Sequence, residues 1–376
     1  MILQTEIQDI TFPLFKNTSM ESIKHPRRMV AAILEQQRAP LVIDEVELPE
    51  RLTCGQVLVR VLYSGICGSQ LGEIDGVKGE DRYLPHLLGH EGVGEVLQVG
   101  EGVRFVHTGQ RVVLHWRKGA GMEAVPATYK WRNKLLNAGW VTTFNQYAIV
   151  SENRLTPVYD DVDTEILPLL GCAVTTGFGV VTNNAKVSIG DSVVVFGAGG
   201  VGLNVVQGAA LAGAYPIVAI DLYDNRLELA ARLGATHCIN GSSQDVMQAI
   251  QDIVGKSGAD VCIDNTGNTK IISMAYSLTA SQGRTVLVGV PHKNDDASIH
   301  TLPLHFGKTL TGSHGGESRP ELDIPRYVKL LRAGKLQLRE CITEVFALEE
   351  INTAIERMRS GELAGRCLIN CYPDLG

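Results

Sequence analysis

The chain has 376 residues, of which 44% are hydrophobic and 20% are charged, a composition typical of folded globular proteins rather than of disordered or fibrous ones. A single hydrophobic core stops growing at roughly 250–300 residues, so this length predicts two domains. The formal net charge of −7 at pH 7 gives no broad positive surface, which argues against nucleic acid or anionic lipid as a partner.

The N-terminal segment, residues 1–28, lacks the basic start and apolar core of a signal peptide, and we expect it to form an extension before the first domain. The eight cysteines are dispersed along the chain and include no Cys-x-x-Cys pair. In a chain of this size, that spacing is typical of reduced thiols in a cytoplasmic protein, some of which can be metal ligands.

Short strands, punctuated by glycine or proline, dominate the chain up to about residue 170. Their β-branched residues and frequent alternation predict a compact β-rich domain. The strands are expected over residues 29–34, 40–48, 56–67, 92–100, 110–116 and 144–150.

From Ser192 onward, strands alternate with helices, which predicts βαβ units and a parallel sheet covered on both faces. We expect strands over residues 192–196, 216–221, 236–240, 260–264 and 285–290, and helices over residues 201–211, 226–233, 245–254 and 271–278. The stretch 192–220 carries no charge, but its six glycines and its changing period favour a strand–helix–strand unit over a membrane span.

Beyond about residue 318, the pattern predicts two amphipathic helices, over 321–334 and 348–361, and a short strand over 366–371. These elements add no further strand to the parallel sheet. We therefore expect them to pack back on the first domain.

The sequence GAGGVG over residues 197–202 directly follows a predicted strand and opens a predicted helix. Its glycines permit a tight turn and a close approach of the backbone, so that a pyrophosphate can bind at the helix N-terminus. The candidate cofactor-binding residues of this loop are Gly197, Gly199, Gly200, Val201 and Gly202.

The next predicted strand ends at Asp221, 19 residues after Gly202, where a carboxylate can accept hydrogen bonds from a ribose diol. An acid at this position repels a 2′-phosphate, and the two residues that follow it are not arginines. The pattern therefore predicts NAD rather than NADP. Arg226 is expected within reach of the same ribose.

Three residues are candidate metal ligands: Cys67 in SGICGSQ and His90 in GHEGVGE, within the predicted β-rich domain, and Cys172 in LLGCAVTTG, just after it. Two thiolates and an imidazole form a donor set that catalytic zinc uses while a fourth position stays open. The separations of 23 and 82 residues are too wide to identify a site by spacing. Taken singly, each residue is more often a buried structural one.

Taken together and in order, the motifs GICGS, GHEGVGEV, the cysteine before TTG, GAGGVG, VGVP and RSGE resemble the zinc-dependent medium-chain alcohol dehydrogenases, from about residue 29 to 370. The resemblance implies an α/β fold in which a GroES-like β-rich catalytic domain, residues 29–172 and 316–376, is interrupted by a Rossmann doubly wound domain, residues 173–315. It also implies transfer of a hydride between NAD(H) and an alcohol or carbonyl compound, with zinc polarising the substrate oxygen.

Position by position, the resemblance implies that Cys67, His90 and Cys172 hold one catalytic zinc. Glu91 matches the acid behind the metal. Ser69 matches the hydroxyl that takes the alcohol proton.

The same resemblance implies further cofactor contacts. Thr176 matches the residue beside the nicotinamide, and Asp221 and Arg226 match contacts to the adenosine ribose. Arg366 matches a basic contact to the pyrophosphate, and His314 is expected near the cofactor.

This chain departs from the family pattern in its metal and proton-relay residues. Residues 114–144 lack the four cysteines of the family's structural zinc, so a second zinc is not expected. Gln70 and Gly72 stand where familiar members carry an aspartate and a histidine, so the usual last step of the proton relay is missing. His86 is either a substitute proton carrier or substrate contact, or a packing residue.

The cysteine-free segment carries cations interleaved with aromatic residues: Trp116, Arg117, Lys118, Tyr129, Lys130, Trp131, Arg132, Lys134 and Trp140. It is either a lobe that gathers a polar or anionic substrate, such as a sugar derivative or a phosphorylated alcohol, or a solvated lobe that packs on another subunit. By the resemblance, the sheet edge near residues 308–316 pairs across a two-fold axis, which implies a homodimer or homotetramer.

Other functions stay open at this point. Within the family, a polyol or sugar dehydrogenase competes with a simple alcohol dehydrogenase. A zinc-free quinone or enoyl reductase shares the architecture but would not need all three candidate ligands. A non-catalytic NAD-binding protein would bind the cofactor without turnover.

Overall fold

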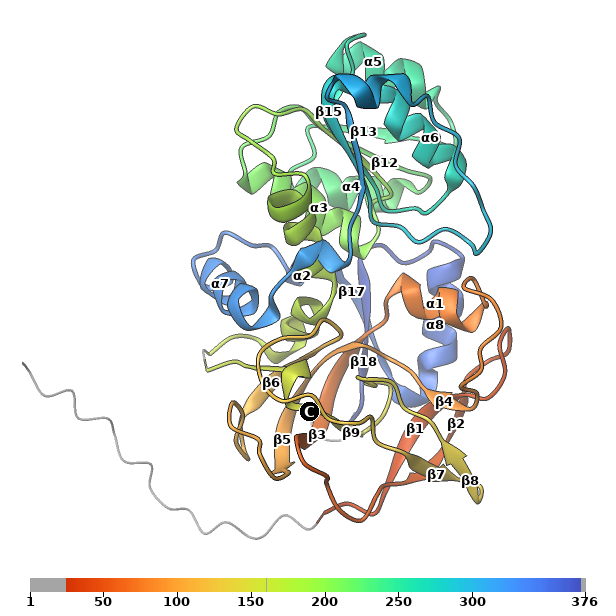
Figure 1. Cartoon of the computed structure of the whole chain (residues 1–376), viewed down its shortest axis with the longest axis vertical. Coiled ribbons are helices and arrows are strands. Elements are labelled where there is room, and N and C mark those ends of the chain that lie inside the picture. The colour runs from red at the N-terminus through yellow and green to blue at the C-terminus, as the bar shows by residue number, and fades with distance from the viewer. Residues whose placement is uncertain (1–24, 160, 373–376) are drawn as a thin grey trace, which may run out of the picture.

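The computed structural model describes residues 25–159 and 161–372. Two parts are stacked along the long axis of the molecule, a β-rich part and a part in which helices cover a sheet (Figure 1). The expected N-terminal extension lies mostly outside the described residues. The first strand, β1, begins at Arg28.

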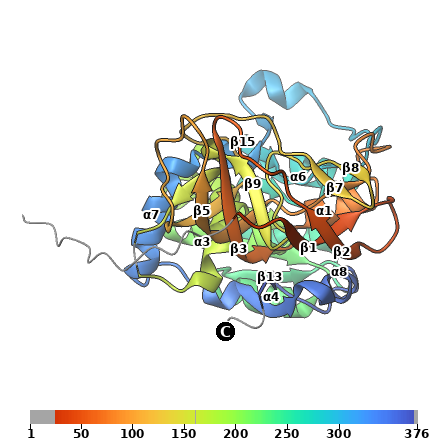
Figure 2. The ribbon, with the colours of Figure 1, turned by 90° about the horizontal axis from the view of Figure 1, so that it is seen from below.

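The β-rich part contains two sheets. The first has the strand order β4-β1-β2-β7-β8 and comprises β1 (Arg28–Leu34), β2 (Val42–Glu47), β4 (His86–Leu87), β7 (Tyr129–Trp131) and β8 (Lys134–Leu136). The second has the order β10-β6-β5-β3-β18-β17, with β9 paired to β3, and comprises β3 (Gln56–Gly65), β5 (Glu91–Val99), β6 (Arg111–His115), β9 (Tyr147–Ser151), β10 (Leu155–Pro157), β17 (Ile342–Ala347) and β18 (Arg366–Asn370). Figure 2 shows β9, β3 and β5 side by side.

Helices flank these sheets and connect the two parts. They are α1 (Gly68–Ile74), α2 (Ala173–Gly179), α7 (Pro320–Arg332) and α8 (Ile351–Arg359). Short helical turns complete the connections: η1 (Glu152–Arg154), η2 (Thr164–Gly171), η3 (Val180–Asn184), η4 (Leu302–Phe306), η5 (Gly315–Glu317), η6 (Arg339–Cys341) and η7 (Leu348–Glu350).

The second part is built on a six-stranded parallel sheet with the order β13-β12-β11-β14-β15-β16. Its strands are β11 (Val193–Phe196), β12 (Ile217–Asp221), β13 (His237–Asn240), β14 (Ala259–Asp264), β15 (Thr279–Leu287) and β16 (Thr309–Gly312). Its helices are α3 (Gly200–Leu211), α4 (Asp224–Arg232), α5 (Val246–Val254) and α6 (Thr269–Leu278). The strand order reverses at β11, which is the switch point where doubly wound sheets bind dinucleotides. The predicted α/β fold, with a doubly wound sheet, is confirmed.

The chain returns to the β-rich part after the parallel sheet. β18 pairs antiparallel with β3, Leu368 opposite Gly65, and β17 pairs parallel with β18. The sequence predicted β18 but missed β17, an edge strand in which Thr343 and Val345 are exposed and only Phe346 is buried. This return places Arg366, the first residue of β18, beside the segments that carry the candidate ligands.

Close helix packing joins the two parts. Every residue of α2 is buried, and α2 packs on α3, the first helix of the parallel-sheet part. A side chain at Gly177 would place its Cβ 2.6 Å from the Cβ of Asn204, so the helices approach too closely for any residue larger than glycine.

Among the described residues, no single helix has the length and apolarity that crossing a membrane requires. A bent pair, Thr164–Gly171 with Ala173–Asn184, meets the criteria of length and composition only.

His115, at the end of β6, is a fully buried histidine held in its neutral form. Its Nδ1 donates to the carbonyl of Arg117 at 2.7 Å, and its Nε2 accepts from the hydroxyl of Thr156 at 2.9 Å. Burial lowers the pKa of His115 to about 4. A proton added to the ring would place an uncompensated positive charge in this buried position and would require the Thr156 hydroxyl to turn round and accept.

We predict that acid destabilises the protein through His115. The unfolded histidine binds a proton near pH 6.5 and the folded one only near 4, so the free energy of unfolding falls as the pH drops through this window. The loss attributable to this residue is about 3 kcal/mol. Urea unfolding at several pH values should show a shallower acid dependence for His115→Asn than for the wild type. Identical slopes would contradict the prediction.

Candidate metal centre and dinucleotide site

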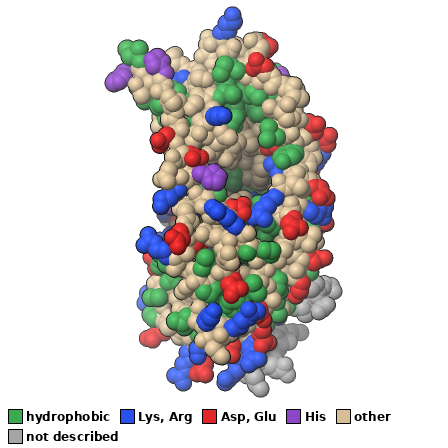
Figure 3. Space-filling model, turned by 90° about the vertical axis from the view of Figure 1, so that its right-hand side faces the viewer, with side chains coloured by type: hydrophobic (Ala, Val, Ile, Leu, Met, Phe, Trp, Pro, Cys, Tyr) green, Lys and Arg blue, Asp and Glu red, His purple; other side chains and the backbone are tan. Residues whose placement is uncertain are grey.

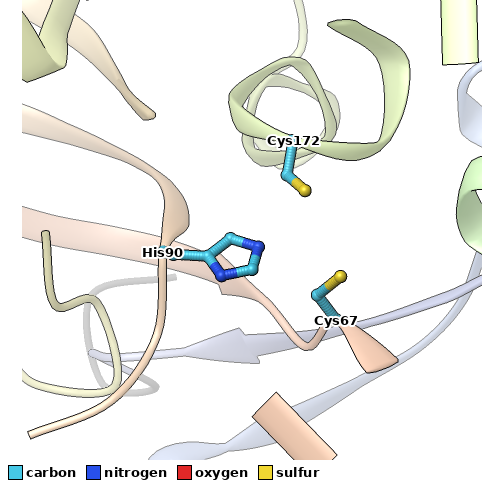
Figure 4. A group of neighbouring side chains, drawn as sticks. All are labelled: Cys67, His90 and Cys172. Carbon is cyan, nitrogen blue, oxygen red and sulfur yellow. The ribbon is translucent and has the colours of Figure 1, made fainter. Parts of the chain in front are cut away.

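Three candidate ligand atoms converge where the two parts of the molecule meet. Cys67 follows β3, His90 precedes β5, and Cys172 precedes α2, and their ligand atoms all lie within 4.8 Å of one another. The three side chains point toward a common space (Figure 4). Cys67 and Cys172 are buried, and His90 is half-buried. The structure thus brings together residues that the sequence separates by 23 and 82 positions.

The chemistry of this group fits a zinc ion. The Nε2 atom of His90 is buried and has no hydrogen-bond partner among the described residues. A hydrogen bond from Cys172, together with the nearby charge of Arg366, holds the pKa of Cys67 well below its usual range, and the same pairing raises the pKa of Cys172. Two sulfurs that compete for one proton, beside an unpaired imidazole nitrogen, form the donor set of a catalytic zinc.

Glu91, the residue after His90, forms an ion pair that the sequence did not reveal. Its Oε1 lies 2.9 Å from Nε of Arg366, and the two side chains are 0% and 4% exposed. Burial raises the pKa of Glu91, and the charge of Arg366 opposes that rise. A Cβ at Gly65 would lie 2.5 Å from this Oε1, and one at Gly171 would lie 3.0 Å from the Cβ of Glu91. The two glycines therefore make room for the carboxylate behind Cys67, His90 and Cys172, the group of candidate ligands that we call the metal cluster.

Gln70, which replaces the family's aspartate, contacts two of the candidate ligands. Its Oε1 accepts a hydrogen bond from the backbone N–H of Cys67 at 3.1 Å, and its Nε2 contacts Nδ1 of His90. If His90 binds a metal through Nε2, its Nδ1 carries the proton and needs an acceptor. Two N–H donors then face an amide that has a single oxygen, whereas a carboxylate would offer one oxygen to each.

The proton-relay candidates occupy different surroundings. Ser69 is exposed in the first turn of α1, two residues after Cys67. His86 is buried, with Nδ1 2.9 Å from the carbonyl of Leu87 and Nε2 2.8 Å from Asp81. Both nitrogens of His86 are thus held by protein groups.

Thr176, expected beside the nicotinamide, is buried in α2. Its backbone N–H donates to the carbonyl of Cys172 at 2.9 Å. The first turn of α2 therefore holds Thr176 and Cys172 in a fixed relation.

The GAGGVG loop forms the turn between β11 and α3. Gly197 has φ +87°, and a Cβ at Gly202 would lie 1.8 Å from the carbonyl oxygen of Gly197. Gly199 caps α3 in an extended conformation, and Val201 lies in its first turn. Only glycine fits at Gly197 and Gly202, and without side chains there the N-terminus of α3 is open to a phosphate.

Arg366 connects this loop with the metal cluster. A Cβ at Gly200 would lie 2.8 Å from its Cζ, and Gly199 forms a backbone bridge with Gly365. The same guanidinium pairs with Glu91. One buried cation therefore lies between the candidate zinc ligands and the candidate pyrophosphate site.

Asp221 lies at the end of β12, as the sequence predicted. Its Oδ2 accepts from the backbone N–H of Ala198 at 2.8 Å, and its Oδ1 accepts from that of Leu222 at 2.8 Å. Arg226 approaches the carboxylate to 3.7 Å and lies over the ring of Tyr223. The carboxylate is thus fixed against the dinucleotide loop.

The cations of the cysteine-free segment do not act together. Arg132 lies over Trp131 and pairs with Asp44, away from the metal cluster. Trp116 and Arg117, in contrast, lie beside it, with the Trp116 ring 6.4 Å from the ring of His90. The sequence analysis treated all these residues as one group because of their composition. The sequence signal that sets Trp116 and Arg117 apart from Trp131 and Arg132 is their position directly after β6.

Comparison with known proteins identifies the family of this chain over most of its length. Residues 53–160 match the family model of the alcohol dehydrogenase GroES-like domain, and residues 200–333 match that of zinc-binding dehydrogenases. An alcohol dehydrogenase class-3 from Cereibacter sphaeroides is 33% identical over 89% of this chain and 98% of its own length. An S-(hydroxymethyl)glutathione dehydrogenase from Paracoccus denitrificans is 32% identical with the same coverage of 89% and 98%.

Solved structures agree with the sequence comparison. The benzyl alcohol dehydrogenase of Acinetobacter calcoaceticus has a TM-score of 0.83 and 30% identity, and the match covers 92% of this chain and 99% of that one. The 2R,3R-butanediol dehydrogenase of Bacillus subtilis has a TM-score of 0.74 and 27% identity, over 91% and 99%. The chain belongs to the zinc-dependent medium-chain alcohol dehydrogenases. It is an oxidoreductase that uses zinc and NAD to interconvert alcohols and carbonyl compounds.

We predict that Gln70 sets the metal affinity. Gln70→Leu removes the amide that contacts both Nδ1 of His90 and the backbone N–H of Cys67, so the affinity for zinc should fall by roughly 10–100-fold. Gln70→Glu offers an oxygen to each donor and should raise it. Competition with a chromogenic chelator measures the affinity without turnover, and Gln98→Leu, a change at an exposed glutamine, is the matched control. Equal affinities in wild type and Gln70→Leu would show that Gln70 has no such role.

Proposed function

We propose that Cys67, His90 and Cys172 hold the catalytic zinc of this alcohol dehydrogenase. The observation that carries the proposal is the convergence of their three ligand atoms within 4.8 Å of one another, at the junction of the two parts of the molecule. A buried arginine, Arg366, links this cluster to the GAGGVG loop. A substrate bound at the metal and a nicotinamide bound at the loop would therefore lie next to each other.

The mechanism divides its tasks among residues of the chain. Zinc supplies Lewis-acid polarisation of the substrate oxygen, which makes an alcohol easier to deprotonate. Glu91 and Arg366 keep the charge behind the ligands balanced in a buried setting. We propose that the exposed hydroxyl of Ser69 accepts the alcohol proton and passes it to water, since Gly72 offers no side chain to relay it.

The cofactor roles follow the same geometry. We propose that the N-terminus of α3 and the guanidinium of Arg366 bind the pyrophosphate, and that Asp221 and Arg226 bind the adenosine ribose. We propose that Thr176, whose backbone N–H is bonded to the carbonyl of Cys172 in the first turn of α2, lies beside the nicotinamide. NAD supplies the acceptor for the substrate hydride.

Residues 29–172 and 316–376 are proposed as the catalytic domain and residues 173–315 as the NAD-binding domain. The pairing of β18 with β3, and the confinement of the parallel sheet to β11–β16, support these limits. We further propose a homodimer or homotetramer that forms through the sheet edge at β16. Exposed Leu302 and Phe306 directly precede that edge, and light scattering measures the mass of the assembly.

We predict that Cys67→Ala abolishes alcohol oxidation and lowers the zinc content to well below one ion per subunit. Loss of one thiolate leaves a two-ligand site that cannot retain the metal. NAD binding, measured by calorimetry, should stay within about twofold because the GAGGVG loop is untouched. Cys54→Ala, at an exposed cysteine, is the matched control. Normal turnover by a metal-free protein would refute the assignment.

We predict a preference for NAD over NADP of about tenfold or more in kcat/KM, because the carboxylate of Asp221 repels a 2′-phosphate. Asp221→Ser should narrow that preference. Initial rates with the two cofactors at one alcohol concentration measure it. A higher kcat/KM with NADP would contradict the role of Asp221.

A further inference from the structure

Two hydrogen-bond donors beside the metal cluster lack an acceptor within the described part of the chain. They are the indole Nε1–H of Trp116 and the Nε–H of Arg117, and both atoms are buried. The Trp116 ring lies 6.4 Å from the imidazole of His90. Because a buried donor without a partner destabilises the folded protein, such groups mark a place where a bound acceptor belongs.

Arg117 also carries a positive charge that is not neutralised by any described carboxylate within ion-pair distance. Arg132, from the same segment, pairs with Asp44 at 2.9 Å. Arg117 instead donates from Nη1 to Nδ1 of His314 at 2.6 Å. Since that nitrogen accepts, the proton of the neutral His314 ring lies on Nε2, which offers a further donor. The three side chains therefore supply a cation and several donors, and the Glu317 carboxylate contacts the group only at the backbone N–H of His314, at 3.0 Å.

These donors are held in a rigid frame. His115 donates to the carbonyl of Arg117 at 2.7 Å, and Arg154 donates to the carbonyl of Trp116. A Cβ at Gly315, whose φ is +65°, would lie 2.5 Å from the Trp116 ring, so this glycine allows the two segments to meet. Donors that are fixed before a ligand arrives bind it without a further ordering cost.

The group lies between the two parts of the molecule. Trp116 and Arg117 follow β6, whereas His314 follows β16, and the rings of Trp116 and His314 pack edge to face at 5.0 Å. Figure 3 shows a hollow in the surface between the two parts, with histidine, basic and acidic side chains around it. A substrate that binds between the two parts, beside Trp116, would have a positively charged neighbour close to the metal cluster.

We infer that Arg117, together with Trp116 and His314, binds an anionic group of the substrate, a carboxylate or a phosphate. The substrate class is then an alcohol, or the corresponding carbonyl compound, that bears an anion at the end remote from the reacting carbon. The planar guanidinium presents paired N–H donors that match the oxygens of either anion. The inference rests on the proposed zinc site, because the anion is placed relative to His90.

The test compares three primary alcohols of similar length: γ-hydroxybutyrate, propanediol monophosphate and n-butanol. The zinc- and NAD-loaded wild type should show a kcat/KM at least about tenfold higher for one of the two anionic alcohols than for n-butanol. The better anion identifies the group as a carboxylate or a phosphate. Added salt should reduce the preference, since a charge near the surface is screened.

Arg117→Met keeps the aliphatic stem and removes the charge. The ratio of kcat/KM for the anionic alcohol to that for n-butanol should fall by roughly 10–100-fold, mainly through KM. Arg117→Lys should restore part of it, because a point charge replaces the planar fork. Arg132→Met, the matched control at the arginine that stacks on Trp131, should leave the ratio unchanged.

Several outcomes would overturn the inference. The first is a wild type with a higher kcat/KM for n-butanol than for either anionic alcohol. The second is an equal loss of kcat/KM for all three alcohols in Arg117→Met. The third is a weakened affinity for NAD in that variant, which would place Arg117 at the cofactor instead. The proposed function fails separately, if zinc and NAD bind and none of the alcohols is oxidised. In that event, binding of γ-hydroxybutyrate or propanediol monophosphate, measured by quenching of tryptophan fluorescence, still tests the anion site. The quenching should be lost in Arg117→Met and kept in Arg132→Met.

Discussion

The buried ion pair between Glu91 and Arg366 is the interaction on which the arrangement of the site depends. A carboxylate and a guanidinium that are 0% and 4% exposed, 2.9 Å apart, lie behind the cysteine and histidine ligands. Neither charge could remain buried alone, because desolvation of a single ion costs several kcal/mol. The pair therefore requires that β5, which begins at Glu91, and β18, which begins at Arg366, occupy fixed positions.

The same pair explains why this site contains so many glycines. Gly65 and Gly171 leave room for Glu91, and Gly200 leaves room for Arg366. Because Arg366 contacts the GAGGVG loop on its other side, the metal cluster and the dinucleotide loop are held by one cation. The geometry that relates zinc ligands to cofactor is set by this packing rather than by either motif.

The front of the site differs from its back. Behind the metal cluster, Glu91 and Arg366 neutralise each other, whereas beside Trp116 no described carboxylate lies within ion-pair distance of Arg117. Balanced charge behind the ligands suits a permanent structural role. Arg117, a cation without an ion-pair partner beside Trp116, suits a ligand that carries a negative charge. This contrast is the basis for the substrate class that we infer.

The sequence by itself determined the fold class, the dinucleotide loop with Asp221, and the candidate ligands, since each of these rests on local patterns. Strand and helix periods, glycines before a helix, and an ordered series of motifs are visible without coordinates. Only the tertiary structure decided which residues touch. It paired Glu91 with Arg366 across 275 positions, placed Gln70 between two ligands, revealed the edge strand β17, and separated Arg117 from Arg132. Contacts between distant segments depend on how sheets and helices pack, and no local pattern encodes that packing.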